Sequence, residues 1–310
     1  MKKLFIIIII IIIIIILHSL AGNAFAYDIV VVKSSLNRVN EQVQYAFHKA
    51  ITKHVTHLGL KAIQPHQIID LVIDNDETSG ESAQKIRNVH PDLTLALGAK
   101  ALMAALEVSD IPIVYLLVIE PEKIIHNRTD VTGISLTVPP TAQFEEIRRY
   151  LPQVKRIGVV YDPKNSSKVI DQIRAARADL QFVSLAAENT TEVPFLLNSL
   201  QGRVDLLWML PDVTVTNLKT LPSYFLFSLQ NKIPLLTFSE KFLNHGATIA
   251  VTFDLGGMAA QAAGLAYDIL SDSQGRDLPT HIAPRVKTLI NHKIAKKLHI
   301  SIAEGEQPND

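Results

Sequence analysis

Short apolar runs alternate with longer amphipathic stretches along almost the whole chain. The runs at residues 28–33, 93–97 and 111–118 are rich in leucine and β-branched residues and have the length of buried strands. The stretches at 39–58 and 256–270 carry apolar residues at helical spacing. Because helices that alternate with buried strands connect parallel strands, the pattern predicts an α/β protein with helices covering both faces of its sheets.

The same reading extends to the rest of the chain. Further strands are predicted at 68–73, 131–136, 156–161, 181–185, 204–210, 233–237, 247–251 and 285–290, and further helices at 76–89, 99–107, 141–150, 165–178, 191–200, 217–230 and 292–298. The cluster Asn165-Ser166-Ser167 is expected to cap the helix that begins there. These strands are too many for one average open sheet, so we expect two lobes. Pro139-Pro140 and Phe253-Asp254 are the expected crossing points.

The N-terminus has the pattern of a secretory signal. Lys2 and Lys3 precede an unbroken apolar run at 4–17, and small residues at Ala24 and Ala26 follow it. We therefore expect a signal peptide at 1–26, cleavage after Ala26 and export to the periplasm. The alternative is an uncleaved anchor, although a spanning helix needs about 20 apolar residues and this run is shorter.

Composition excludes several classes of function. The chain has 310 residues with 30 basic and 30 acidic side chains, and removal of residues 1–26 leaves 28 basic and 30 acidic. This balance gives no basic face for nucleic acid, so no nucleic-acid partner is expected. The absence of cysteine excludes thiol nucleophiles, cysteine-ligated zinc and iron–sulfur clusters. It also excludes a lipoprotein anchor, which requires a cysteine at the cleavage site.

The sequence lacks the usual motifs of cofactor binding and catalysis. It contains no P-loop, no G-x-G-x-x-G turn and no G-x-S-x-G elbow. We therefore expect no cofactor, no catalytic residue and no enzyme activity. His48, His54 and His57 fall on one predicted helix and could hold a metal ion, but a solvated helix face explains them equally well. No metal is expected.

Polar residues follow the predicted strands at the point where each strand ends. Ligands of open parallel sheets bind at the carboxyl ends of strands, so these residues are the candidate ligand site. They are Ser34, Ser35, Asn37, Gly98, Ala99, Lys100, Glu120, Tyr161, Asn165, Ser166, Asp212, Ser239 and Asp254. The carboxylates favour a ligand with an amino group, and the helix N-terminus behind Gly98 suits a carboxylate. Helix caps and turns are the structural alternative for each residue alone.

Three segments carry a resemblance to a known family. Residues 91–101 (PDLTLALGAKA), 151–163 (LPQVKRIGVVYDP) and 204–212 (VDLLWMLPD) are similar, in this order, to segments of ABC-transporter substrate-binding proteins, including receptors of the tryptophan and tyrosine type. The chain departs from those receptors at Ala99, where they carry threonine, and at Glu120, where they carry aspartate. The resemblance implies the type I periplasmic-binding-protein fold, with two Rossmann-like lobes joined by three crossings.

The resemblance also implies a domain plan and a mode of action. We expect an N-terminal lobe of residues 27–138 plus 254–280, a C-terminal lobe of 139–253 plus 281–300, and a polar tail at 301–310. A monomer would capture a small molecule in a cleft that closes by a hinge, and would deliver it to a membrane permease. An amino acid or a related amine is the ligand that we expect. The alternatives are a ligand-sensing module for a signalling partner, an enzyme using Asp162 or Asp212, and a structural protein without ligand.

Overall fold

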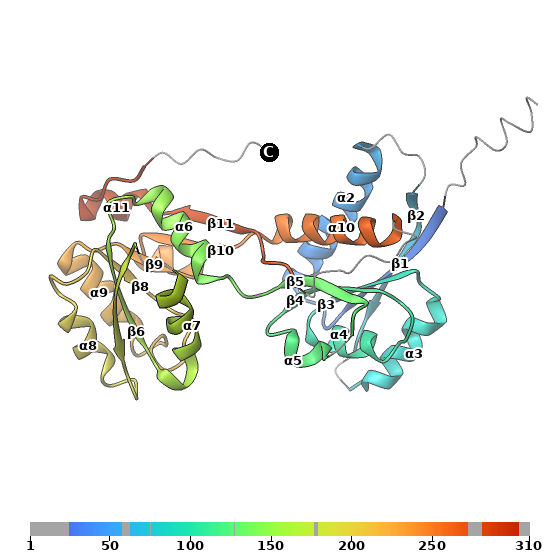
Figure 1. Ribbon diagram of the computed structural model, residues 1–310, viewed down its shortest axis with the longest axis horizontal. Helices are drawn as coiled ribbons and strands as arrows, with labels where there is room; N and C mark the ends of the chain where they lie inside the picture. The colour runs from blue at the N-terminus through green and yellow to red at the C-terminus, as the bar shows by residue number, and fades with distance from the viewer. Residues whose placement is uncertain are drawn as a thin grey trace, which may run out of the picture. The chain divides into compact units, whose positions relative to one another are not determined.

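The chain folds into two compact units. The computed structural model describes residues 25–57, 63–74, 76–126, 128–176, 179–271 and 281–303 (Figure 1). One unit contains the chain up to Thr137 together with Leu255–Pro284, and the other contains Val138–Asp254 together with the chain from Arg285 onward. The chain therefore passes from one unit to the other three times, as the family resemblance implied.

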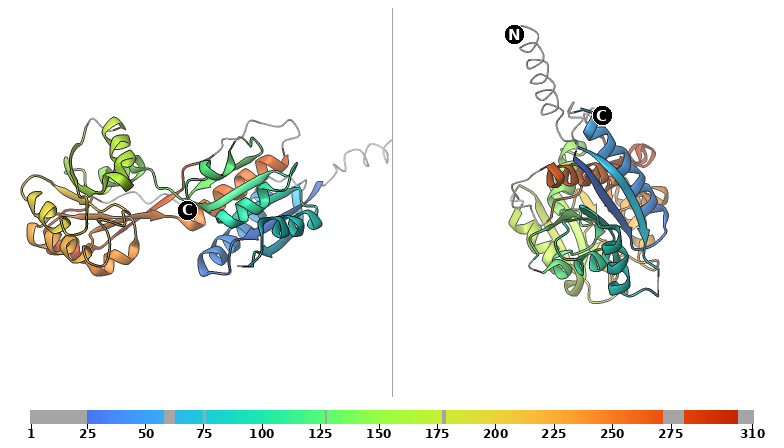
Figure 2. Two further views of the ribbon diagram at one scale, coloured as in Figure 1. Left: turned by 90° about the horizontal axis from the view of Figure 1, so that it is seen from below. Right: turned by 90° about the vertical axis from the view of Figure 1, so that its right-hand side faces the viewer.

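The first unit contains a five-stranded, fully parallel sheet. Its order is β2-β1-β3-β4-β5, and the long β1 and β2 lie side by side (Figure 2). The strands are β1 (Phe25–Lys33), β2 (Ile63–Val72), β3 (Leu93–Leu97), β4 (Ile113–Val118) and β5 (Val131–Ser135). All five residues of β3 are buried, as its continuous apolar run requires.

Helices cover both faces of this sheet. Helices α2 (Arg38–His57) and α10 (Leu255–Ser271) pack together on one face, and α3 (Ser79–Val89), α4 (Ala99–Leu106) and α5 (Glu122–Ile125) lie on the other (Figure 1). Helix α3 begins with a capping box, because the Thr78 hydroxyl accepts from Glu81 N–H while the Glu81 carboxylate accepts from Thr78 N–H. The short α5 was not expected from the sequence.

Residues 281–284 belong to this first unit, whereas the sequence analysis placed them in the C-terminal lobe. Ile282 pairs with the end of β5: its N–H donates to Gly133 O at 2.8 Å, and Ser135 N–H donates to Ile282 O at 3.2 Å. These two backbone bonds hold the segment against β5 before the chain leaves the unit.

The second unit contains a six-stranded sheet of order β11-β10-β9-β8-β6-β7. Its strands are β6 (Arg156–Tyr161), β7 (Gln181–Ala186), β8 (Leu206–Trp208), β9 (Leu235–Thr237), β10 (Ile249–Phe253) and β11 (Val286–Ile290). The predicted parallel arrangement is confirmed for β6 to β10, whereas β11 is antiparallel to β10. The chain re-enters at Arg285, beside Asp254 where it left, so it must run back along β10; Asp254 N–H donates to Arg285 O at 2.9 Å.

Successive residues of β8 face opposite layers of the second unit. Leu206 and Trp208 pack with α6 (Pro140–Tyr150) and α7 (Pro163–Ala176), while Leu207 packs with α8 (Val193–Ser199) and α9 (Leu221–Asn231). Trp208 is a core residue, as predicted, and its indole N–H donates to Gln143 Oε1 at 2.9 Å. The unit is completed by α11 (His292–Leu298) and by a 3₁₀ helix at Glu240–His245, which the sequence did not predict.

The signal peptide and its cleavage site are the two expectations about the N-terminus. Most of the predicted signal peptide lies outside the described residues, and β1 begins at Phe25, two residues before the expected mature N-terminus. Within the part of the chain that the structure describes, no helix is long and apolar enough to cross a membrane.

Candidate functional site

At the carboxyl edge of the first sheet, Ser34 and Gly98 together join the ends of β1, β3 and β4. Ser34 N–H donates to Leu97 O at 3.0 Å, and Gly98 N–H donates to Leu116 O at 2.9 Å. The Ser34 hydroxyl accepts from Ala101 N–H at 3.0 Å and thereby caps α4 rather than the helix that follows it in sequence. The same contact takes one of the N–H groups that the sequence analysis assigned to a ligand carboxylate.

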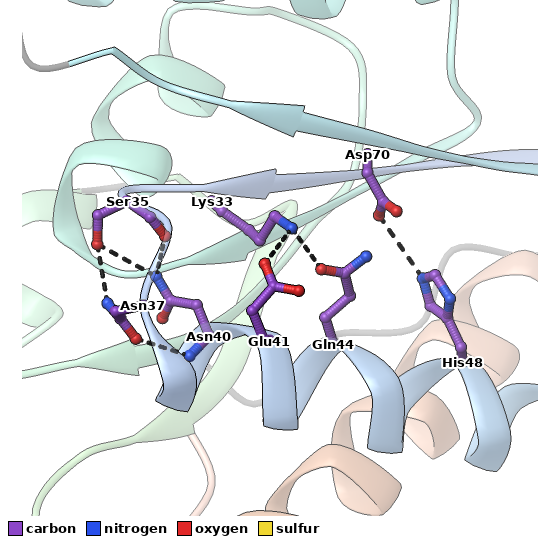
Figure 3. A network of polar contacts seen from close by, with 8 residues as sticks. All are labelled: Lys33, Ser35, Asn37, Asn40, Glu41, Gln44, His48 and Asp70. Carbon is purple, nitrogen blue, oxygen red and sulfur yellow. Dashed lines mark hydrogen bonds and ion pairs between the residues drawn. The ribbon is translucent and has the colours of Figure 1, made fainter.

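Ser35 and Asn37 lie in the turn that leads from β1 into α2, as Figure 3 shows. Asn40 N–H donates to Asn37 Oδ1 at 2.9 Å, so Asn37 is the N-cap. Asn37 Nδ2 donates to Ser35 Oγ at 2.8 Å, and Asn40 Nδ2 donates to Ser35 O at 2.8 Å. These three side chains hold the β1–α2 turn, and Leu36 within it is 71% exposed.

Lys33 is a buried cation that the sequence analysis did not single out. It ends β1, is only 5% exposed, and donates to Glu41 Oε1 at 2.8 Å and to Gln44 Oε1, both on α2 (Figure 3). The sequence contained a sign of this contact. Lys33 ends an apolar strand, and the next helix carries Glu41 and Gln44 three positions apart, so both lie on one helix face. The contact ties α2 to the strand whose end carries Ser34 and Ser35.

The remaining candidates of the first unit lie on its surface. Ala99 and Lys100 are exposed in the first turn of α4. Glu120 is also exposed, and its carboxylate is 2.6 Å from Lys123 Nζ. An exposed pair of this kind contributes little to stability, so it leaves Glu120 able to exchange partners.

In the second unit, the ends of β6 and β8 are joined through Asp212. This side chain is 2% exposed and accepts four hydrogen bonds. Asp162 N–H donates at 2.9 Å, Ser166 Oγ at 2.7 Å, Asn165 Nδ2 at 3.0 Å and Thr214 N–H at 3.0 Å. Its carboxylate therefore binds two loops together, as a buried acidic group surrounded by donors.

Asp162 is the N-cap of α7. Its Oδ1 accepts from Lys164 N–H at 2.9 Å, and Pro163 occupies the first helical position. The expectation that the cluster from Asn165 to Ser167 caps this helix was wrong, because Asp162-Pro163 starts it earlier. Hydrogen bonds from the Thr214 hydroxyl and from Lys164 N–H lower the pKa of Asp162, which favours its ionised form.

Tyr161, Ser239 and Asp254 lie at strand ends but do not join this network. Tyr161 is half-buried and packs on the core beside α6 and α7. Ser239 precedes the 3₁₀ helix without capping it by its side chain, and the backbone N–H of Asp254 donates to Arg285 O, away from the network. Asn165, Ser166 and Asp212 are thus brought together, and Asp162 and Thr214 are the partners that the candidate set lacked.

A hollow of about 530 Å³ lies at the opposite, amino-terminal end of the second sheet. Asp205 lines it together with Lys232, Ile233 and His299. Although desolvation raises the pKa of Asp205, hydrogen bonds from the Arg156 side chain and from two backbone N–H groups hold it below its usual value. The negative charge of Asp205 is therefore already balanced by Arg156. The hollow is also remote from the strand ends that carry the candidate residues.

The predicted histidine group is described in part only. His48 Nε2 lies 3.7 Å from Asp70 Oδ1 (Figure 3), whereas the side chains of His54 and His57 lie outside the described residues. Among the side chains that are described, no group of three or more histidine, aspartate or glutamate residues could hold a metal ion.

A family model described as "ABC transporter substrate binding protein" matches residues 38–305. A curated relative, a tyrosine-binding protein of Clostridioides difficile (strain R20291), is 25% identical over 236 residues, which are 72% of this chain and 68% of the relative.

Two solved structures share the fold. The ligand-free, open structure of a substrate-binding protein with adhesive properties from Clostridium difficile has a TM-score of 0.69 at 20% identity, covering 91% of this chain and 97% of the other. An arabinose-binding protein from Geobacillus stearothermophilus has a TM-score of 0.53 at 11% identity, covering 88% and 99%. Both similarities concern the fold, since the identities are low.

Proposed function

The chain belongs to the family of ABC transporter substrate-binding proteins, and from that premise we propose that its solute is an amino acid or a related amine. The family establishes the capture of a small molecule. The observation that carries the finer proposal is the tyrosine-binding relative, which is 25% identical over 72% of the chain. The polar residues at the carboxyl edge of each sheet are consistent with it, since such edges are where ligands of α/β sheets bind.

Each unit, taken by itself, has strand-end residues that suit one group of such a solute. In the first unit, the α4 N-terminus behind Gly98 retains the N–H groups of Ala99 and Lys100, for which the described residues offer no acceptor. These groups suit a carboxylate. In the second unit, the edge around Asn165 offers oxygen acceptors, which suit an amine.

The proposed role is delivery of the solute to a membrane permease. Members of the family typically act outside the cytoplasmic membrane, and we propose periplasmic export after cleavage at Ala26. A solute shifts the protein toward whichever conformation binds it better, and the permease would recognise that conformation. We further propose that the protein is a monomer and that the solute leaves it chemically unchanged, because substrate binding is the family's function.

Thermal unfolding with candidate solutes tests the proposal. The exported protein would be unfolded, refolded to remove carried-over solute, and heated with amino acids, amines, nucleosides or sugars. A solute at 100 times its Kd adds about 2.7 kcal/mol, which raises the midpoint by about 4–5 °C for a protein of this size. We expect such a shift with one class of amino acid. A shift with sugars alone would contradict the proposal.

The same preparation tests the location and the partner. Mass spectrometry of the exported protein should give a chain that begins at Tyr27. Solute-dependent stimulation of a reconstituted permease would support transport, whereas the same solute acting only through a membrane kinase would favour the sensing alternative.

A further inference from the structure

Asn165, in the first turn of α7, is held by its amide nitrogen. Nδ2 lies 3.0 Å from Asp212 Oδ1 and 3.1 Å from Thr214 Oγ1, with Asp162 Oδ2 at a longer 3.4 Å. All three of these atoms are oxygens that can accept a hydrogen bond. The two N–H groups of the amide are therefore both directed toward the oxygens of Asp212, Thr214 and Asp162.

The opposite orientation of the amide is strongly disfavoured. It would place Asn165 Oδ1 against two carboxylates, which have no hydrogen to donate when ionised. The Thr214 hydroxyl could not help, because its hydrogen is committed to Asp162 Oδ2 at 2.6 Å. Electrostatics thus fixes which end of the Asn165 amide faces inward.

The buried carboxylates are unsuited to touch a solute. Asp162 is 5% and Asp212 is 2% exposed, and both are bound by donors of the two loops. Asn165 is exposed, and among the described residues nothing donates to its Oδ1. We infer that Asn165 Oδ1 is the acceptor that recognises an N–H donor of the solute, and that Asp162 and Asp212 are positioning residues that orient it. The inference rests on the proposed function for the identity of the donor.

The orientation can be tested without any solute. Asn165→Asp replaces both N–H groups by an oxygen that faces the acidic pair, so we expect the unfolding midpoint to fall by at least about 3 °C at pH 7. Asn244→Asp, an exposed position of the same unit, is the matched control and should change the midpoint by less than about 1 °C. The double variant Asn165→Asp with Asp212→Asn restores a donor opposite the new acid and should recover part of the loss. An unchanged midpoint in Asn165→Asp would overturn the orientation.

Recognition is tested by titration calorimetry with two matched probes, L-tyrosine and its deaminated analogue 3-(4-hydroxyphenyl)propionate. Loss of a hydrogen bond to a charged amine weakens binding by about 10- to 100-fold. We expect Asn165→Ala to weaken L-tyrosine by this factor and to leave the analogue nearly unchanged. An equal loss for both probes would overturn the inference. If the wild-type protein binds neither L-tyrosine nor any other amino acid, the proposed function fails, while the midpoint measurements still decide the orientation.

Discussion

Gly98 and Ser34 approach each other so closely that a methyl group on Gly98 would lie 2.6 Å from Ser34 Oγ. The approach follows from the bond between Ser34 Oγ and Ala101 N–H, which draws the β1 turn onto the start of α4. Gly98 also has a φ of +94°, a conformation that residues with a side chain rarely adopt. One turn is therefore constrained both by its backbone and by its neighbour.

Gly98→Ala should destabilise the first unit by about 1–3 kcal/mol, because the added methyl group strains the backbone and displaces Ser34. Chemical denaturation measures the change. Gly264→Ala is the matched control, since Gly264 lies within α10 with no atom within 4 Å of an added Cβ, and it should be neutral or stabilise by up to about 1 kcal/mol. If the Ser34 contact contributes, the Gly98→Ala penalty will be smaller in a Ser34→Gly background.

Asp212→Ala should destabilise the second unit by about 2–5 kcal/mol. The reason is that Asp162 N–H and the Ser166 hydroxyl are buried and would lose their acceptor, at about 1–3 kcal/mol each. Asp212→Asn keeps one acceptor oxygen and should cost less. Urea unfolding measures both, with Asp171→Ala as control because that side chain is 75% exposed on α7. A loss for Asp212→Ala no larger than for the control would contradict this role.

Removal of Glu41 should cost more than removal of Lys33. Glu41→Ala leaves the 5% exposed Lys33 ammonium without its counter-charge, which we expect to cost about 1–3 kcal/mol. Lys33→Met leaves only Glu41, whose side chain is 53% exposed and remains hydrated, so this change should be nearly neutral. Denaturation of both variants beside Glu145→Ala, an exposed control on α6, gives the comparison. A larger loss of stability for Lys33→Met than for Glu41→Ala would contradict this account of the Lys33–Glu41 ion pair.

The ion pair of Asp205 and Arg156 should make stability depend on acid pH. Because the pKa of Asp205 is lowered in the folded protein, its contribution is fully present above the unfolded pKa, near 4, and is lost as the pH falls through the folded value. The difference in stability between wild type and Asp205→Asn should thus be constant from pH 5 to 7 and shrink below pH 4. Asp171→Asn serves as control, and a difference that grows toward acid pH would contradict the assignment.

Local sequence predicted several elements to the residue. Strands β3 and β6 and helix α11 begin and end where the sequence patterns predict. Gly98 follows β3, Asp162-Pro163 follows β6, and Asn291 precedes α11. The start of α7 was misplaced although Asp162-Pro163 marked it, because the later Asn165-Ser166 cluster gave the same capping signal. The direction of β11 depended on where the chain re-enters its unit, which no local pattern encodes.

The sequence by itself determined that parallel strands end in polar residues, and hence which residues stand at the carboxyl edges. Only the tertiary structure decided what those residues do. Ser34 and Ala101 are 67 positions apart, and Asp162 and Asp212 are 50 apart. The physical reason is that hydrophobic periodicity is a property of neighbours along the chain, whereas a buried polar group is bound by whichever partner the packing of strands brings within 3 Å. Asp212, one of the carboxylates that the sequence offered to a solute, is bound by the protein itself, whereas Asn165 beside it stays exposed.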